Sequence, residues 1–163
     1  MITEQLVKKY PIISDQIEKR ELVALLRCIE QIVQVHPAVS IVEFGCYVGT
    51  TSLFIRRLCD HYGFTGEFHV YDSFSGLPEK STYDRSPMGE QFKTGELNAS
   101  KKAFIQNFKK NNLMLPTIHK KWFSDLGSNE IPDGIGFAFL DGDYYESIHD
   151  SLHLITPKMK KMP

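Results

Sequence analysis

The hydrophobic positions of the chain follow two spacings, one typical of helices and one typical of buried strands. From residue 15 to residue 36, leucine, isoleucine and valine recur at steps of three and four, which predicts an amphipathic helix. We expect Ser14 or Asp15 to cap this helix and His36-Pro37 to end it. The single apolar stripe indicates a helix that packs against the rest of the domain.

Short apolar runs and helical patterns then alternate along the chain. The pattern predicts strands at residues 39–45, 68–72, 117–119 and 135–140, and helices from residue 50, at 98–112 and at 145–155. The run at 135–140 is continuously apolar, as expected of a strand that is buried on both faces. Residues 73–97 are polar and rich in turn-forming residues, which is typical of a lid or a mobile loop.

Strands that alternate with helices predict a parallel sheet with helical crossovers. The expected fold class is therefore α/β: a Rossmann-like, doubly wound, mainly parallel sheet with helices on both faces. We divide the chain into an N-terminal helical segment, residues 1–37, and a Rossmann-like domain, residues 38–163. The sequence contains no internal repeat and no low-complexity tract that would suggest a different organisation.

Composition narrows the class of protein further. The chain has 163 residues, of which 42% are hydrophobic and 24% charged, which excludes a disordered or fibrous protein. Nineteen Lys and Arg against 20 Asp and Glu give a net charge of −1, so no global basic excess favours nucleic acid or an anionic membrane as a partner. Three widely spaced cysteines and the lack of a long apolar stretch predict reduced thiols and a cytoplasmic location.

Three acidic residues fall where predicted strands end: Glu43, Asp72 and Asp141. Ligands of open parallel sheets bind beyond the carboxyl ends of the strands, so these residues are candidates for a binding site. After the first strand, two glycines and three hydroxyl residues lead into a helix, an arrangement that suits an anionic group. Tyr47 stands where the dinucleotide fingerprint needs glycine, which disfavours a dehydrogenase. A purely structural turn is the alternative for this segment.

The other two strand ends add candidate chemistry. Asp72 is suited to accept hydrogen bonds from ribose hydroxyls, as acidic residues do at the same place in other nucleotide-binding sheets. Asp141 and Asp143 are two carboxylates two residues apart, which suits a divalent cation, or one ligand and one general base. Each motif alone is commonly a turn, and it is their shared position at strand ends that indicates a site.

Four stretches taken together resemble the class I S-adenosylmethionine-dependent methyltransferases, and more narrowly the macrocin O-methyltransferase family. They are EFGCYVG at 43–49, YDSFSGLP at 71–78, KWF at 121–123 and LDGDYYES at 140–147. Their spacing also fits that family, although Lys121 stands where the family has glycine. The resemblance implies an enzyme that transfers a methyl group from S-adenosylmethionine to a hydroxyl of a sugar or a similar small molecule.

The resemblance also implies roles for individual residues. The cofactor-binding set consists of Glu43, Gly45, Gly49, Thr50 and Ser52 at the methionine end, Asp72 and Ser73 at the ribose, and Trp122 near the adenine. Asp141 would bind Mg²⁺, and Asp143 would be the general base for the acceptor hydroxyl. The loop at 79–97 would cover the substrate.

In the family, the strand that follows the 145–155 helix ends in two adjacent acidic residues that complete the metal site. The sequence stops at Pro163, before that strand, so we expect a sheet that is incomplete at its C-terminal side and Mg²⁺ binding only in a longer form. Two alternatives stay open: a truncated or degenerate binding module without activity, and a methyltransferase of catechols or other phenols. The oligomeric state also stays open, because the N-terminal helix would serve equally to join two copies or to cover the sheet.

Overall fold

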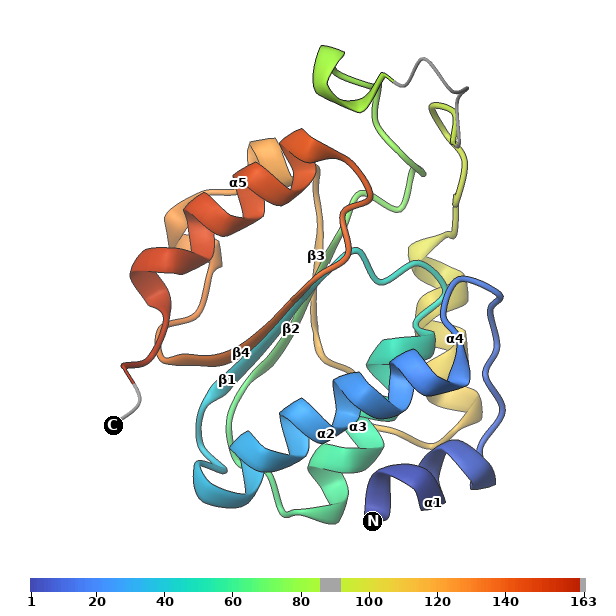
Figure 1. Ribbon diagram of the computed structural model, residues 1–163, viewed down its shortest axis with the longest axis vertical. Coiled ribbons are helices and arrows are strands. Elements are labelled where there is room, and N and C mark those ends of the chain that lie inside the picture. Colours follow the sequence, from blue (N-terminus) through green and yellow to red (C-terminus); the bar gives the residue numbers. More distant parts are fainter. Residues whose placement is uncertain (86–91, 162–163) are drawn as a thin grey trace.

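The computed structural model describes residues 1–85 and 92–161 (Figure 1). Its sheet has the order β3-β2-β1-β4, with every neighbouring pair parallel, and consists of β1 (Ser40–Phe44), β2 (Phe68–Asp72), β3 (Thr117–Lys120) and β4 (Ile135–Leu140). The α-helices are α1 (Ile2–Lys9), α2 (Lys19–Val35), α3 (Thr50–His61), α4 (Lys101–Lys110) and α5 (Tyr145–Ile155). The predicted Rossmann-like α/β fold is confirmed.

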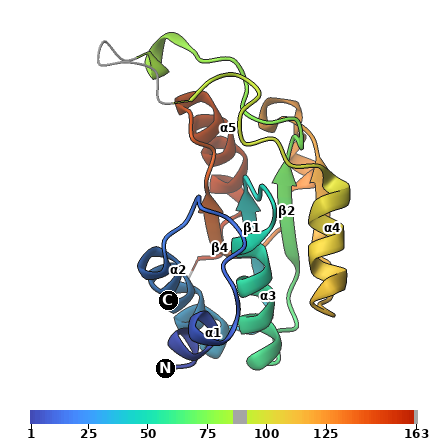
Figure 2. The ribbon, with the colours of Figure 1, turned by 90° about the vertical axis from the view of Figure 1, so that its right-hand side faces the viewer.

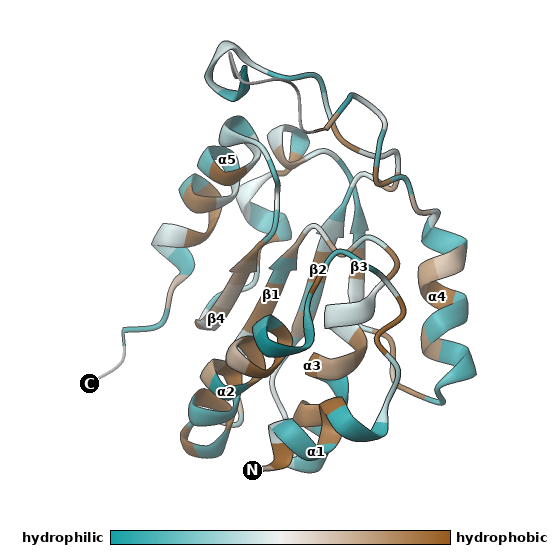
Figure 3. Cartoon of the chain, turned by 45° about the vertical axis from the view of Figure 1, so that its right-hand side comes forward, coloured by the Kyte–Doolittle hydropathy of each residue, from teal (hydrophilic) through white to brown (hydrophobic). Residues whose placement is uncertain are grey.

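Helices cover both faces of the sheet. Successive strand residues point to opposite sides, so each strand contributes side chains to a core on either face. Ile41 of β1 belongs to the core under α1, α2, α3 and α4, whereas its neighbour Val42 and Phe44 belong to the core on the α5 side. Figure 1 shows the sheet between α5 on one face and α2 and α3 on the other, and Figure 2 views the molecule from the side of α3 and α4. Hydrophobic residues follow the strands and parts of α2 and α3, as Figure 3 shows.

The N-terminal region differs from the prediction of one helix over residues 15–36. The first helix, α1, was not predicted, and α2 begins only at Lys19. A capping box sets this start: the Glu18 N–H donates to Glu21 Oε2 at 2.8 Å, and the Glu18 side chain accepts in return from the backbone at the third helical position. Ser14 and Asp15 therefore do not cap the helix.

Residues 11–18, which we name the N-terminal strap, connect α1 to α2 without helical structure. Ile12 and Ile17 of the strap pack against the core on the α2 side of the sheet. The predicted start at residue 15 rested on Ser14 or Asp15 as the cap, and residues 15–18 belong to the strap because Glu18 caps the helix instead.

The remaining predicted elements agree closely with the structure. The helix expected at 98–112 is α4, which begins after Ser100, whose hydroxyl accepts from the Ala103 N–H at 3.1 Å. The predicted loop at 73–97 contains one short 3₁₀ helix, Thr82–Asp84, and residues 86–91 of this expected substrate cover lie outside the described residues. In the part of the chain that the structure describes, no helix is both long and apolar enough to cross a membrane.

Candidate functional site

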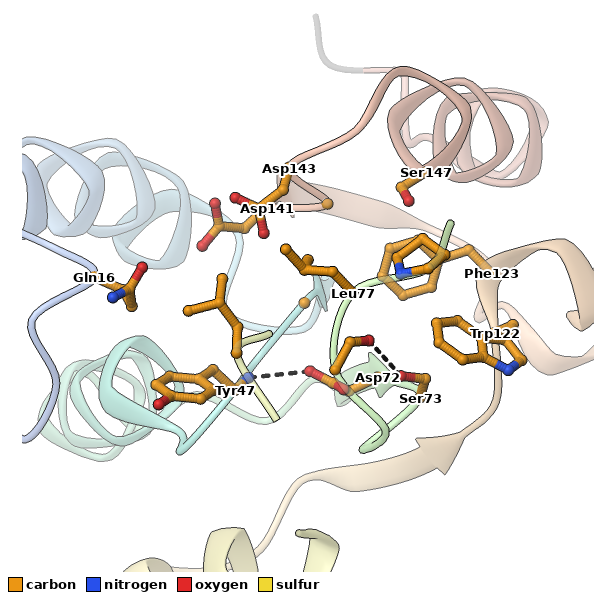
Figure 4. Close-up of a pocket in the computed structure, with 15 residues that line it drawn as sticks. Gln16, Tyr47, Asp72, Ser73, Leu77, Trp122, Phe123, Asp141, Asp143 and Ser147 are labelled. Atoms are coloured by element: carbon orange, nitrogen blue, oxygen red, sulfur yellow. Dashed lines mark hydrogen bonds between the residues drawn. The ribbon is translucent and has the colours of Figure 1, made fainter. Parts of the chain in front are cut away.

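A cavity of about 730 Å³, open to solvent, lies at the carboxyl end of the sheet (Figure 4). Its walls come from the loops after β1, β2, β3 and β4 and from the N-terminal strap. Six of the predicted site residues line it: Gly45, Asp72, Ser73, Trp122, Asp141 and Asp143.

Asp72 joins the loops that follow β1 and β2. Its Oδ2 accepts from the backbone N–H groups of Cys46 at 2.9 Å and Tyr47 at 3.0 Å, and its Oδ1 accepts from the Phe74 N–H at 2.7 Å. A carboxylate has about four lone-pair positions, so Asp72 keeps capacity to accept a further bond from a ligand in the cavity. Beside it, the Ser73 hydroxyl donates to the Gly76 carbonyl at 3.2 Å and stabilises the turn after β2.

Two glycines give the first loop its shape. Gly45 has φ +85°, and a Cβ atom there would lie 2.2 Å from the carbonyl oxygen of Asp141. The ends of β1 and β4 are in contact at this point, where the Asp141 N–H donates to the Phe44 carbonyl at 2.8 Å. Gly49 has φ +88° at the start of α3, and a Cβ atom there would lie 2.8 Å from the ring of Phe104. Both positions therefore require glycine.

The other predicted cofactor residues, Glu43, Gly49, Thr50 and Ser52, do not line the cavity but lie behind its wall. Glu43 is 1% exposed, and its Oε2 accepts from the Ser52 hydroxyl at 2.5 Å. Its Oε1 and the Thr50 hydroxyl are buried without a hydrogen-bond partner among the described residues. Burial raises the pKa of Glu43 to about 8, with a further increase from the charges of Asp141 and Asp72. Glu43 is therefore protonated at neutral pH.

Asp141 and Asp143 have different surroundings. Asp141 lines the cavity with its side chain open to solvent, and the partial desolvation by the cavity walls, together with the negative charge of Asp143, raises its pKa to about 6. Partial burial also raises the pKa of Asp143, and its backbone is left-handed at φ 55°. Carboxylates whose pKa moves towards neutrality are suited to accept a proton during a reaction.

Sequence reasoning missed part of the lining. Several missed residues belong to the motifs already quoted, so their position was a usable signal: Tyr47, Gly76, Leu77, Pro78, Phe123, Gly142 and Ser147. Leu97 comes from the long loop before α4. Gln16 comes from the N-terminal strap, and no pattern in the sequence pointed to it.

A second cavity, of about 990 Å³, adjoins the first and shares with it Leu77, Pro78, Trp122, Phe123 and Ser147. The loop after β2 and the start of α5 form its outer walls. Asp84 of this loop caps α5, because its Oδ1 accepts from the Tyr145 N–H at 2.8 Å. The described part of the predicted cover is thus attached to the helix beside the site.

The donor set around Asp141 does not by itself fit a resident Mg²⁺ ion. Mg²⁺ prefers octahedral coordination by several oxygen atoms, and among the described lining residues the carboxylate that interacts with Asp141 is that of Asp143. Within residues 1–85 and 92–161, three potential ligands come together only at Glu146, His149 and Asp150 on α5. That group does not include Asp141.

Comparison with known proteins places this geometry in a family context. The chain matches the family model described as Macrocin-O-methyltransferase (TylF) over residues 10–161. A curated relative from Streptomyces olivaceus, 8-demethyl-8-(2,3-dimethoxy-alpha-L-rhamnosyl)-tetracenomycin-C 4'-O-methyltransferase, is 27% identical over 139 residues. The match covers 81% of this chain and 53% of the relative, so the chain spans about half the length of that protein.

Two solved structures share the fold. The O-methyltransferase NovP superposes with a TM-score of 0.76 at 23% identity, covering 96% of this chain and 69% of NovP. The calicheamicin methyltransferase CalS11 superposes with a TM-score of 0.68 at 18% identity, covering 98% of this chain and 74% of CalS11. At these identities the likeness establishes the arrangement of the sheet and its helices.

Proposed function

The chain belongs to the macrocin O-methyltransferase family, and from this premise we propose that it acts in methyl transfer from S-adenosylmethionine to a hydroxyl of a sugar or a similar small molecule. The observation that carries the proposal is the cavity at the carboxyl end of the sheet, whose lining includes Gly45, Asp72, Trp122 and Asp141 of the family motifs. The printed name of the curated relative describes methylation of a 4'-oxygen in a rhamnosyl compound, which supports a sugar hydroxyl as the acceptor.

The lining suits this cofactor in shape and charge. Asp72 has acceptor capacity for the ribose hydroxyls, and the Trp122 indole, 37% exposed, offers an aromatic face to the adenine. Asp72, Asp141 and Asp143 carry the ionisable acidic groups of the lining, and none of the described lining residues is basic. A cavity with negatively charged walls favours a ligand that carries a positively charged sulfonium and an ammonium group.

When bound, the cofactor supplies a methyl group that is already a good electrophile, so the protein must orient the acceptor oxygen and remove its proton. We assign the role of proton acceptor to the Asp143 carboxylate, which would take the proton of the acceptor hydroxyl as the oxygen–carbon bond forms and the methyl–sulfur bond breaks, the electron pair staying on the sulfur. Asp141 contributes a negative charge next to Asp143. The contact between Asp84 and the start of α5 holds the loop after β2 over the second cavity, where it limits the access of water.

Incubation of the protein with methyl-labelled S-adenosylmethionine and either a rhamnoside or a catechol tests the proposal. We expect the label on a sugar oxygen, and we expect Asp143→Asn to reduce the rate by about 10²-fold or more while cofactor affinity is retained. Label on the catechol alone would favour the phenol-directed alternative. A protein that binds no S-adenosylmethionine, or an Asp143→Asn variant with an unchanged rate, would contradict the proposal.

A further inference from the structure

We propose that Gln16 hydrogen-bonds the amino-acid end of the cofactor, so that the N-terminal strap forms part of the binding site. This inference rests on the proposed function, because it names a residue that would contact the same cofactor. It concerns a segment outside the sheet and its crossover helices, for which the sequence suggested only a packing or interface role.

The strap is held in place on both sides of Gln16. Ile12 and Ile17 pack against the core formed with α1, α2 and α3. At its N-terminal side, the Tyr10 ring lies under the Arg57 guanidinium, 3.9 Å from the ring centroid. At its C-terminal side, the capping box of Glu18 starts α2. Gln16 is therefore held at the cavity by a segment that is anchored at both ends.

The Gln16 amide is oriented and still able to bind. Its Nε2 donates to Asp15 Oδ1 at 2.8 Å, whereas no described residue donates to its Oε1. Gln16 lies on the side of the cavity formed by Tyr47, and it faces Asp141 and Asp143 across the opening (Figure 4). Trp122 and Phe123, which suit the adenine, are at the opposite end. Gln16 is thus at the end where the amino-acid group would lie.

An amide suits this end of the ligand better than a charged side chain. The α-ammonium needs acceptors, and Gln16 Oε1 supplies one on the Tyr47 side of the cavity. The α-carboxylate of the same group would be repelled by a further acidic side chain, whereas a neutral amide leaves it undisturbed. Gln16 would therefore discriminate ligands that carry an amino-acid group from those that lack one.

The test compares two ligands that differ only in this group. S-Adenosylhomocysteine carries the ammonium and the carboxylate, and 5'-methylthioadenosine lacks both while keeping the adenosine. Calorimetry measures the affinity of wild-type protein and Gln16→Ala for each ligand. Gln31→Ala is the matched control, because Gln31 is an exposed glutamine on α2 that does not line the cavity.

We expect Gln16→Ala to weaken the affinity for S-adenosylhomocysteine about tenfold, which is the effect of one hydrogen bond to a charged group. The affinity for 5'-methylthioadenosine should change by less than about twofold. Gln31→Ala should leave both affinities unchanged. An equal loss for both ligands would make the strap a merely structural element and overturn the inference, as would no loss at all. If the wild-type protein bound neither ligand, the proposed function itself would fail, which is a distinguishable result.

Discussion

The helix layer and the strand-end loops of this molecule are built in contrasting ways. In the helix layer, formed by α1 to α4 on one face of the sheet, fully buried aliphatic side chains such as Leu22, Leu26 and Ile29 pack against β1 and β2. In the strand-end loops, residues 45–49, 73–78 and 141–144, the chain adopts left-handed backbone at several positions and surrounds a buried carboxyl group, Glu43.

The contrast indicates that the helix layer stabilises the fold and that the strand-end loops form the binding site. Left-handed backbone and poorly hydrated carboxyl groups reduce stability, and they persist where a ligand or a reaction requires them. The helix layer supplies apolar burial that offsets this cost. Substitutions in the helix layer should therefore change stability alone, whereas substitutions in the loops should change ligand binding or its pH dependence.

The largest expected effect comes from Gly45→Val. The new side chain would collide with the Asp141 carbonyl oxygen at a backbone position that only glycine adopts easily, so we expect a loss of about 4 kcal/mol in the free energy of unfolding, together with loss of S-adenosylhomocysteine binding. Urea denaturation and calorimetry measure both. Gly63→Ala is the control: Gly63 also has positive φ but has open space around it, so it should cost about 1 kcal/mol. Equal losses of unfolding free energy in the two variants would mean that the contact between Gly45 and Asp141 imposes no special requirement for glycine.

Next in size is Leu26→Ala in the helix layer. Leu26 is 0% exposed, and the cavity left by its truncation should lower the free energy of unfolding by about 3 kcal/mol. Affinity for S-adenosylhomocysteine, measured at a temperature where the variant stays folded, should change by less than about twofold. A parallel loss of affinity would show that the two regions are not separable.

Glu43→Gln should raise stability in a pH-dependent way. Burial raises the pKa of Glu43 from an ordinary value of 4.5 to about 8, so between these pH values the folded state retains a proton that the unfolded state has lost. Wild-type stability therefore falls with rising pH across this window, by up to about 1.4 kcal/mol per unit, and glutamine removes the effect.

The Glu43→Gln variant should exceed the wild type by about 2 kcal/mol at pH 6 and match it near pH 4.5. Denaturant unfolding of both proteins across this range checks the prediction. A constant difference at every pH would mean that Glu43 does not titrate in the folded state as its burial implies.

The smallest expected effect concerns Asp141. Its pKa is raised to about 6, so the carboxylate is mostly neutral below that pH and charged above it. The affinity for cationic S-adenosylmethionine relative to neutral-sulfur S-adenosylhomocysteine should rise about threefold as pH increases from 5 to 7. Asp141→Asn should abolish this rise. If the ratio of the two affinities in the wild type did not depend on pH, Asp141 would not interact with the sulfonium group.

The sequence predicted the strands and the crossover helices well because each has a strong local signal, such as the apolar run that becomes β4. It placed Asp72 and Asp141 at one site because the carboxyl ends of parallel strands meet at one edge, and the family resemblance added Trp122. It did not predict the N-terminal strap, since Ser14 and Asp15 are residue types that commonly cap a helix, whereas the observed cap is Glu18 and the strap is held by tertiary contacts of Ile12 and Ile17. Nor did it separate Glu43 from the cavity lining, because depth behind the wall depends on packing against α3.

The central claim is that the strand-end loops form a site for the cofactor, and calorimetric titration with S-adenosylhomocysteine tests it most directly. We predict binding on the order of micromolar for the wild type, and at least thirtyfold weaker binding, about 2 kcal/mol, for Asp72→Asn, which loses acceptor capacity for backbone N–H groups and ribose alike. Asp133→Asn is the matched control, since Asp133 is 87% exposed and pairs with Lys158 away from the cavity. Unchanged affinity in Asp72→Asn, or no binding by the wild type, would contradict the account.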